Sequence, residues 1–195
     1  MPRLIHGFEP ISYNKQLISE TVEKNSPIIL RNVVLQRAET KNQNGRVYPR
    51  DILSREAKSF QQLIDERRAL GELDHPESTT VNLRNVSHNI TAMKFDGDDL
   101  IGDIEVLTTP SGNILRELLR NGIKLGVSSR GLGSVENGDA GEVIVQDDFQ
   151  LLCFDVVSNP STQGAFLTEG KSFAPVKYPV VNALIIDFLT EINEK

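Results

Sequence analysis

Two alternating apolar segments joined by a short polar turn lie in the middle of the chain and restrict its fold more than any other feature. Branched and aromatic side chains recur through residues 86–95 and 100–107, and Asp96-Gly97-Asp98-Asp99 separates the two segments. Gly and Asp tolerate the backbone angles that a tight turn requires, so this pattern predicts a β-hairpin. Strands joined by hairpins pair antiparallel, which favours an antiparallel sheet or barrel.

The rest of the chain supplies further strands and amphipathic helices. Helical spacing of apolar residues predicts helices over residues 50–68 and 113–120, the second opened by Thr109-Pro110-Ser111-Gly112. Branched residues predict strands over residues 27–38, 69–73, 123–129, 131–136 and 142–157, with a kink or turn inside the last. We therefore expect an α+β fold of about seven mostly antiparallel strands with helices packed outside.

The two ends of the chain lack this regular pattern. Residues 1–26 show no clear period and predict a loosely packed N-terminal lead-in with a short helix over residues 14–24. Residues 27–160 form the expected main domain. Residues 161–195 form a C-terminal tail that we expect to be loop-like at first and helical over residues 179–192.

Composition narrows the class of protein. A length of 195 residues suits one domain, and a net charge of -6 without a Lys/Arg block disfavours nucleic-acid binding. The single cysteine, Cys153, excludes an internal disulfide framework and a cysteine-rich zinc site. The sequence has no signal peptide, apolar membrane span, Walker loop or Gly-x-Gly-x-x-Gly motif, so we expect a soluble, non-secreted protein without a cofactor.

Among the three histidines, His6, His75 and His88, the second has the most distinctive surroundings. It follows the predicted strand 69–73 in Asp74-His75-Pro76, and the proline restricts the backbone of the residue before it. Such a fixed corner suits a general base, which must be held within hydrogen-bond reach of its nucleophile. The pattern alone leaves a histidine in a surface turn as the alternative.

Ser128 follows a short apolar segment in Gly126-Val127-Ser128-Ser129-Arg130-Gly131. A serine hydroxyl becomes a nucleophile when a base takes its proton, and neighbouring glycines give a substrate carbonyl close access. Backbone N–H groups near Arg130 and Gly131 are candidates for stabilising an oxyanion. The motif differs from the Gly-x-Ser-x-Gly of hydrolases, and a small-residue strand end in a tight barrel is the alternative interpretation.

Asp155 lies inside an apolar strand-like segment, Leu151–Val157. A carboxylate buried there needs a partner, and orienting a catalytic imidazole is one such role. An aspartate that faces water on an edge strand is the alternative. Asp74, His75 and His88 are a weaker candidate metal site, because Glu72-x-x-His75 is not the His-Glu-x-x-His zinc signature.

Three segments taken together resemble a known family. They are Asn44-Gly-Arg-Val-Tyr-Pro49, Ala69-Leu-Gly-Glu-Leu-Asp-His-Pro76 and Gly126-Val-Ser-Ser-Arg-Gly-Leu-Gly-Ser134. In order and spacing these segments resemble the prohead (capsid maturation) serine proteases of T-even-like tailed phages. The resemblance covers residues 30–170, most of the chain.

The resemblance implies a fold similar to the herpesvirus assemblins, a mostly antiparallel seven-stranded β-barrel surrounded by helices. It implies His75 as the general base, Ser128 as the nucleophile and Asp155 as the third catalytic residue, with His88 as the rival. The third position is His in the herpesvirus relatives and acidic in many phage ones. The resemblance also implies that Arg130 and Gly131 support the oxyanion. It implies no metal in the site.

The implied function is a serine endopeptidase that cleaves phage scaffold and major capsid proteins inside the assembling prohead, in the host cytoplasm. Such enzymes cut after Leu/Ile-x-Glu, and Leu167-Thr168-Glu169-Gly170 fits this preference. We therefore expect the chain to cut itself between Glu169 and Gly170. The expected partners include a homodimer or higher oligomer but neither nucleic acid nor membrane, and a catalytically silent head-assembly component of the same fold is the alternative.

Overall fold

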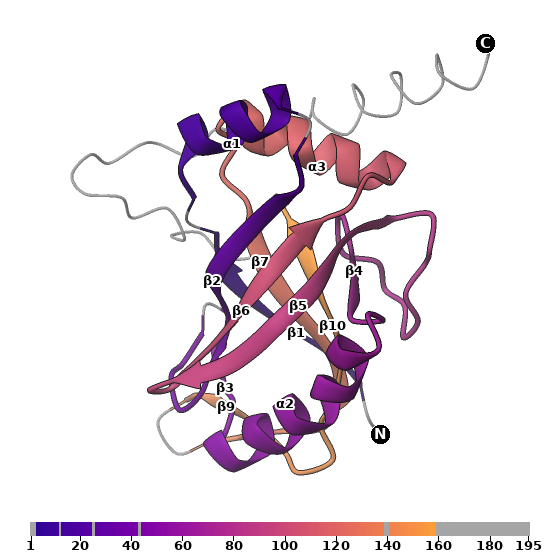
Figure 1. The fold of residues 1–195 in the computed structure, drawn as a ribbon. Helices are drawn as coiled ribbons and strands as arrows, with labels where there is room; N and C mark the ends of the chain where they lie inside the picture. The colour runs from indigo at the N-terminus through magenta and orange to yellow at the C-terminus, as the bar shows by residue number, and fades with distance from the viewer. Residues whose placement is uncertain (1–2, 12, 25, 43, 139–140, 159–195) are drawn as a thin grey trace, which may run out of the picture. The chain divides into compact units, whose positions relative to one another are not determined.

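The computed structural model describes residues 3–11, 13–24, 26–42, 44–138 and 141–158 (Figure 1). These residues form ten strands and three helices, all within one structural unit of the chain, residues 1–165. The strands are arranged in three sheets of three, four and three strands. Six of the seven strand pairings in the described ranges are antiparallel, as the hairpin pattern predicts.

The first sheet joins the beginning and the end of the domain. Its central strand, β7 (Gly126–Gly133), pairs antiparallel with β1 (Arg3–Pro10) on one side and with β10 (Gln150–Val157) on the other. Successive side chains of a strand point to opposite faces. Val127 and Ser129 therefore share one face of β7, and Ser128 and Arg130 share the other.

The second sheet contains the predicted hairpin. Strands β5 (Val86–Asp96) and β6 (Asp99–Val106) pair antiparallel, and Gly97 has a positive φ of 58° in the turn between them. The outer strands are β2 (Ile28–Arg37), which pairs with β6, and β4 (Leu70–Glu72), which pairs with β5. The chain leaves β4 into a loop over residues 73–85 that leads to β5.

The third sheet is short and lies beside a small apolar cluster. In it β3 (Arg46–Val47) pairs parallel with β9 (Val143–Val145), which pairs antiparallel with β8 (Val135–Asn137). The Tyr48 ring that follows β3 packs edge-on against Phe149, with centroids 5.5 Å apart. These two rings form a small apolar cluster with three aliphatic side chains, Ile5, Ile52 and Val145.

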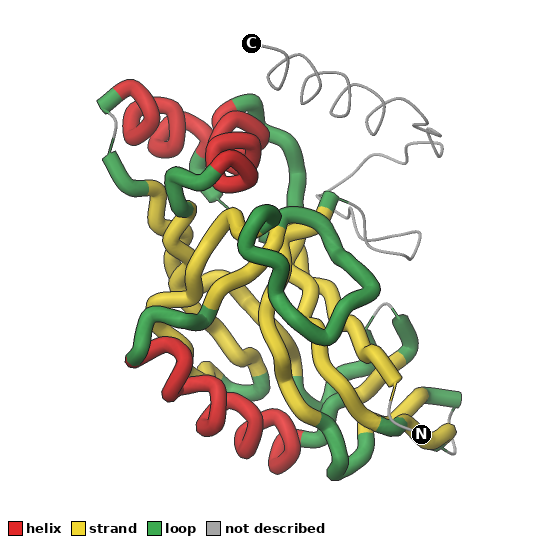
Figure 2. The backbone as a smooth tube through the Cα atoms, turned by 90° about the vertical axis from the view of Figure 1, so that its right-hand side faces the viewer, coloured by secondary structure: helices red, strands yellow, loops and turns green. Residues whose placement is uncertain are grey.

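Three helices cover the two ends of the strands (Figures 1 and 2). Helices α1 (Lys15–Glu23) and α3 (Pro110–Arg120) pack together at one end, and α2 (Arg50–Asp65) lies at the other. The Thr109 hydroxyl caps α3 by accepting a hydrogen bond of 3.0 Å from the Gly112 N–H, as its start signal predicts. None of the described helices is long and apolar enough to span a bilayer.

The main hydrophobic core joins the first sheet, the second sheet and the helices. Val127 and Phe154 contribute from the first sheet and Ile90 from the second, while Leu115 contributes from α3. The Phe154 ring packs edge-on against Phe60 of α2, with centroids 5.4 Å apart. One face of β7 is thus buried in the core, and the opposite face is available for the polar side chains of the strand.

The prediction of a seven-stranded barrel is not confirmed, although the α+β class and the antiparallel character are. No closed barrel is detected in the described ranges, and the ten strands there form three separate sheets. The predicted strand 142–157 divides into β9 and β10 at a turn, as its expected kink indicates. Strands β3 and β8 have two and three residues, too few to leave an alternating pattern in the sequence.

The prediction of a loosely packed N-terminal lead-in is wrong for residues 3–10, although the short helix is confirmed by α1. Strand β1 pairs with β7 along its whole length, from Arg3 opposite Gly133 to Pro10 opposite Gly126. Backbone hydrogen bonds hold this strand, and they leave no apolar period in the sequence.

The two strands predicted over residues 123–129 and 131–136 are not separated at Arg130. Residues 126–133 form one strand, because Arg130 stays in the ladder with its charge paired.

Candidate active site

A tight turn after β4 fixes the position of His75. Leu73 forms a parallel bridge with Val156 of β10, and the Asp74 N–H donates a hydrogen bond of 2.8 Å to the Val156 carbonyl. Asp74 has a positive φ of 71°, a conformation that aspartate tolerates better than most residues. Pro76 restricts the backbone on the other side of His75. The turn therefore holds the imidazole beside β10.

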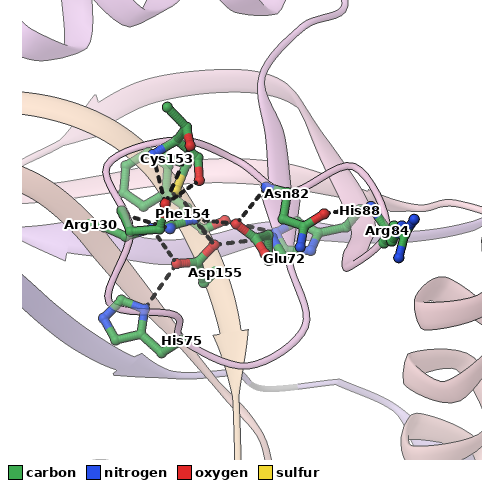
Figure 3. A network of polar contacts seen from close by, with 11 residues as sticks. Glu72, His75, Asn82, Arg84, His88, Arg130, Cys153, Phe154 and Asp155 are labelled. Carbon is green, nitrogen blue, oxygen red and sulfur yellow. Dashed lines mark hydrogen bonds and ion pairs between the residues drawn. The ribbon is translucent and has the colours of Figure 1, made fainter.

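Asp155 of β10 is completely buried, and donors from three elements reach its carboxylate (Figure 3). Oδ2 lies 2.9 Å from Nδ1 of His75, and Oδ1 accepts a hydrogen bond of 3.0 Å from the Glu72 N–H. Burial disfavours the charged carboxylate, but the hydrogen bond to His75 and the charge of Arg130 outweigh it and lower the pKa of Asp155. A carboxylate facing Nδ1 favours a proton there, which leaves Nε2 as the basic nitrogen.

Ser128 lies directly opposite Asp155 in the β7–β10 ladder. Paired residues of antiparallel strands share a face of the sheet, and their Cβ atoms are about 5 Å apart. The ladder therefore brings the Ser128 hydroxyl to the face on which Asp155 contacts His75. Ser128 is 4% exposed and the His75 side chain is 20% exposed.

Ser129 points the other way. It lies opposite Phe154, a core residue, and its hydroxyl accepts a hydrogen bond of 2.8 Å from Nε2 of Gln36 on β2. Gly7 of β1 makes room for this contact, because a Cβ there would lie 2.2 Å from the Gln36 amide nitrogen. Of the two adjacent serines, only Ser128 shares a face with Asp155.

The Arg130 side chain is buried beneath the loop that follows His75, and its donors are engaged. Nη2 donates to Glu72 Oε1 at 2.8 Å, and Nη1 donates to the Ser78 carbonyl at 2.9 Å. Nε lies 3.0 Å from Asp155 Oδ2 and 3.2 Å from the Cys153 sulfur. Arg130 therefore connects β4, β10 and the loop over residues 73–85.

Arg130 and Gly131 are also the residues expected to support an oxyanion through their backbone. Both lie inside β7, between β1 and β10, where ladder hydrogen bonds take up most backbone groups. The register of β10 shifts opposite them, between Leu151 and Cys153. An irregularity of this kind leaves the local ladder incomplete. The oxyanion role of the two residues stays a prediction.

His88, the rival third residue, lies in a different environment. Its Nδ1 is 2.8 Å from the Ser87 hydroxyl and its Nε2 is 3.0 Å from the Phe154 carbonyl, so both ring nitrogens bind groups other than His75. Gly71 allows this packing, because a Cβ there would lie 2.2 Å from the ring. Complete burial lowers the pKa of His88 to about 4.

Comparison with known families shows the family of the whole chain. The family described as prohead core protein serine protease has a sequence model that matches residues 14–173. The chain belongs to this family. The match includes the turn that holds His75, the strand that carries Ser128 and the strand that carries Asp155.

Two relatives within the prohead protease family support the assignment. The prohead core protein protease of enterobacteria phage T4 is 34% identical over 139 residues, which are 69% of this chain and 66% of that protein. The chain thus matches slightly less than two thirds of that relative's length. A solved structure, described as the bacteriophage T4 capsid assembly protease, has a TM-score of 0.69 and 27% identity over 82% of this chain and 99% of the solved one.

Two members of the buried network have no role in the sequence-based prediction for this chain. Glu72 has a usable signal, since it lies three residues before His75 within the family motif. Cys153 lies two residues before Asp155, a spacing that places both side chains on one face of β10. The predicted cleavage site at Glu169 and Gly170 and the tail over residues 161–195 lie outside the described residues.

Proposed function

We propose that this chain is a serine endopeptidase in which Ser128 is the nucleophile, His75 the general base and Asp155 the residue that orients the imidazole. One observation carries the proposal. Asp155 contacts Nδ1 of His75 at 2.9 Å and lies opposite Ser128 in the sheet ladder. Membership of a family described as serine proteases supports the same assignment.

In the proposed reaction, Ser128 Oγ attacks the carbonyl carbon of the scissile peptide while Nε2 of His75 accepts the hydroxyl proton. The same nitrogen then gives the proton to the leaving amine, and water hydrolyses the acyl-enzyme by the reverse transfers. Asp155 stabilises the imidazolium formed in each step. Backbone N–H groups near Arg130 and Gly131 are proposed to bind the oxyanion, and losing one such donor costs about 3 kcal/mol in the barrier.

The proposed substrates are scaffold and capsid proteins inside the assembling phage prohead, in the infected cell. The names of the T4 relatives, a prohead core protein protease and a capsid assembly protease, support this class of substrate. We propose cleavage after Leu/Ile-x-Glu, including cleavage of this chain between Glu169 and Gly170. We further propose that residues 27–160 act as the protease domain and that residues 161–195 form a tail, from which this cleavage removes residues 170–195.

Two adjacent serines provide the test of the nucleophile. Ser128→Ala should reduce cleavage of a peptide with the sequence of residues 164–174 by at least about 10⁴-fold, because the acyl-enzyme cannot form. Ser129→Ala is the matched control, since it removes a hydroxyl from the neighbouring position on the core side of β7. If Ser128→Ala cleaves as fast as the wild type, Ser128 is not the nucleophile. If the wild type itself does not cleave the peptide, the catalytically silent head-assembly alternative is favoured.

Intact mass after expression tests the proposed self-cleavage. The wild type should lose a fragment that begins at Gly170, and Ser128→Ala should keep its full length. A Glu169→Ala variant should also keep its full length while still cleaving the separate peptide. A wild type that remains at full length while it cleaves the peptide would contradict self-cleavage and leave the proposed nucleophile intact.

A further inference from the structure

The carboxylate that faces His75 is also bound by a buried cation. Arg130 approaches Asp155 with Nε at 3.0 Å from Oδ2 and with Nη2 at 3.2 Å from Oδ1. Both side chains are buried, so water screens their interaction weakly. A guanidinium that neutralised Asp155 alone would reduce its ability to stabilise an imidazolium at His75.

Glu72 supplies a second carboxylate to the same guanidinium. Its Oε1 accepts hydrogen bonds from Arg130 Nη2 at 2.8 Å and from the Asn82 N–H at 3.0 Å, and its side chain is completely buried. Two carboxylates thus surround one guanidinium, which leaves one net negative charge beside His75. The pairing shares the charge of Arg130 between Glu72 and Asp155.

The second oxygen of Glu72 is unusual for a carboxylate with a purely structural role. Oε2 is buried and accepts no hydrogen bond within the described part of the chain. A buried acceptor without a partner destabilises a fold, and each such group calls for an explanation. The position of Glu72 offers such an explanation. Its backbone N–H binds Asp155, and its side chain binds Arg130.

We propose that Glu72 is a positioning residue for catalysis, which shares the charge of Arg130 so that Asp155 keeps a net negative charge for His75. This role rests on the proposed Ser128–His75–Asp155 mechanism. Glu72 touches neither substrate nor reacting atoms, and it acts through Arg130. The structure assigns it the further task of tying the loop over residues 73–85 to the site through the Asn82 N–H.

The other titratable groups around His75 remain the same when Glu72 is changed. Asp74 and Glu77 flank the histidine in the same turn and are exposed. On β10, burial and then the charge of Asp155 raise the pKa of the Cys153 thiol, which keeps it neutral. A change in the pH dependence of the site can therefore be traced to Glu72 and Arg130.

The test measures how fast a serine-reactive phosphonate labels Ser128 as a function of pH, with the site of labelling confirmed by mass spectrometry. Glu72→Gln keeps the shape and removes the charge. We expect the acid limb of the labelling profile to move about one pH unit lower and the plateau rate to fall about tenfold. The double variant Glu72→Gln/Arg130→Gln restores one net negative charge, so its acid limb should return to the wild-type position.

Glu56→Gln is the matched control for Glu72→Gln. Glu56 is also a buried carboxylate that binds a β10 amide, through a hydrogen bond of 2.8 Å from the Leu151 N–H to Oε2, but its ion-pair partner is Arg55. Its removal should leave the acid limb in place. A shift as large as that of Glu72→Gln would overturn the proposal, because the effect would then follow from any buried carboxylate.

A second double variant covers the case in which Glu72→Gln does not fold. Replacing both members of a buried ion pair by apolar residues is often neutral for stability, so Glu72→Leu/Arg130→Met should fold. It keeps the single negative charge of Asp155, and we expect a wild-type acid limb. A displaced limb in this variant, or an unchanged limb in Glu72→Gln, overturns the role of Glu72. Failure of the phosphonate to label Ser128 in the wild type would instead refute the proposed function.

Discussion

Lowering the pH from 7 to 5 should destabilise this protein through His88, a residue outside the proposed mechanism. The ring is completely buried between β5 and β10, with Nδ1 at 2.8 Å from the Ser87 hydroxyl and Nε2 at 3.0 Å from the Phe154 carbonyl. Burial lowers the pKa of His88 from 6.5 to about 4, and the Phe154 carbonyl and the charge of Asp155 oppose this only in part. His88 is therefore neutral in the folded protein at pH 5.

The size of the effect follows from the two pKa values. The unfolded chain binds a proton at this histidine below about pH 6.5, whereas the folded protein binds it only below about pH 4. The contribution of neutral His88 to the free energy of unfolding is therefore fully present above pH 6.5 and is lost progressively as the pH falls towards 4. Each pH unit between these values is about 1.4 kcal/mol, which gives a loss of about 2 kcal/mol between pH 7 and pH 5 and about 3 kcal/mol in full.

Urea unfolding of Ser128→Ala at pH 7 and pH 5 measures this loss without interference from self-cleavage. The comparison is Ser128→Ala/His88→Gln, in which the glutamine amide can still donate to the Phe154 carbonyl but cannot become charged. The free energy of unfolding of the first protein should fall by about 2 kcal/mol more than that of the second. Equal losses in the two proteins would refute the assignment of acid sensitivity to a buried neutral His88.

Three substitutions test the packing around the site and its supports. Gly71→Ala should lower the free energy of unfolding by about 3 kcal/mol, because the new Cβ would lie 2.0 Å from the Phe154 carbonyl oxygen; a stability loss under about 1 kcal/mol would show that β4 can move away. Thr109→Ala removes the cap of α3 and should cost about 1 kcal/mol, measured by urea unfolding, with Ser111→Ala as the control that leaves the cap in place. Leu115→Ala, in the core face of the same helix, should cost about 2 to 5 kcal/mol, and a smaller loss would mean that the core refills the cavity.

The elements with long, regular patterns could be predicted from the sequence. Strands β5 and β6 have 11 and 8 residues on either side of a glycine turn, and α2 and α3 carry apolar residues at helical spacing. Strand β1 could not be predicted, because its partner lies more than 100 residues later and the contact is made through the backbone. The two-residue β3 and the three-residue β8 are too short for any period to appear.

In the candidate site, the sequence indicated single residues better than their contacts. His75 and Ser128 stand out by their flanking residues, and each lies in one of the segments that resemble the family. The choice between Asp155 and His88 depends on strand register, since both lie in mainly apolar strands and only Asp155 is paired with Ser128. The contact of Arg130 with Glu72 joins positions 58 residues apart, and no local pattern reports it.

Strand β1 has a consequence for the moment at which the proposed active site can first form. Strand β1 is synthesised more than 100 residues before its partner β7 and before β10, the strand that carries Asp155. Contacts between such distant segments form late and slowly, since the chain between them must first be closed into a loop. A chain in synthesis thus holds His75 long before it holds Ser128 and Asp155. With the proposed mechanism, a chain assembled in this order stays inert towards its neighbours until its own translation has passed residue 157.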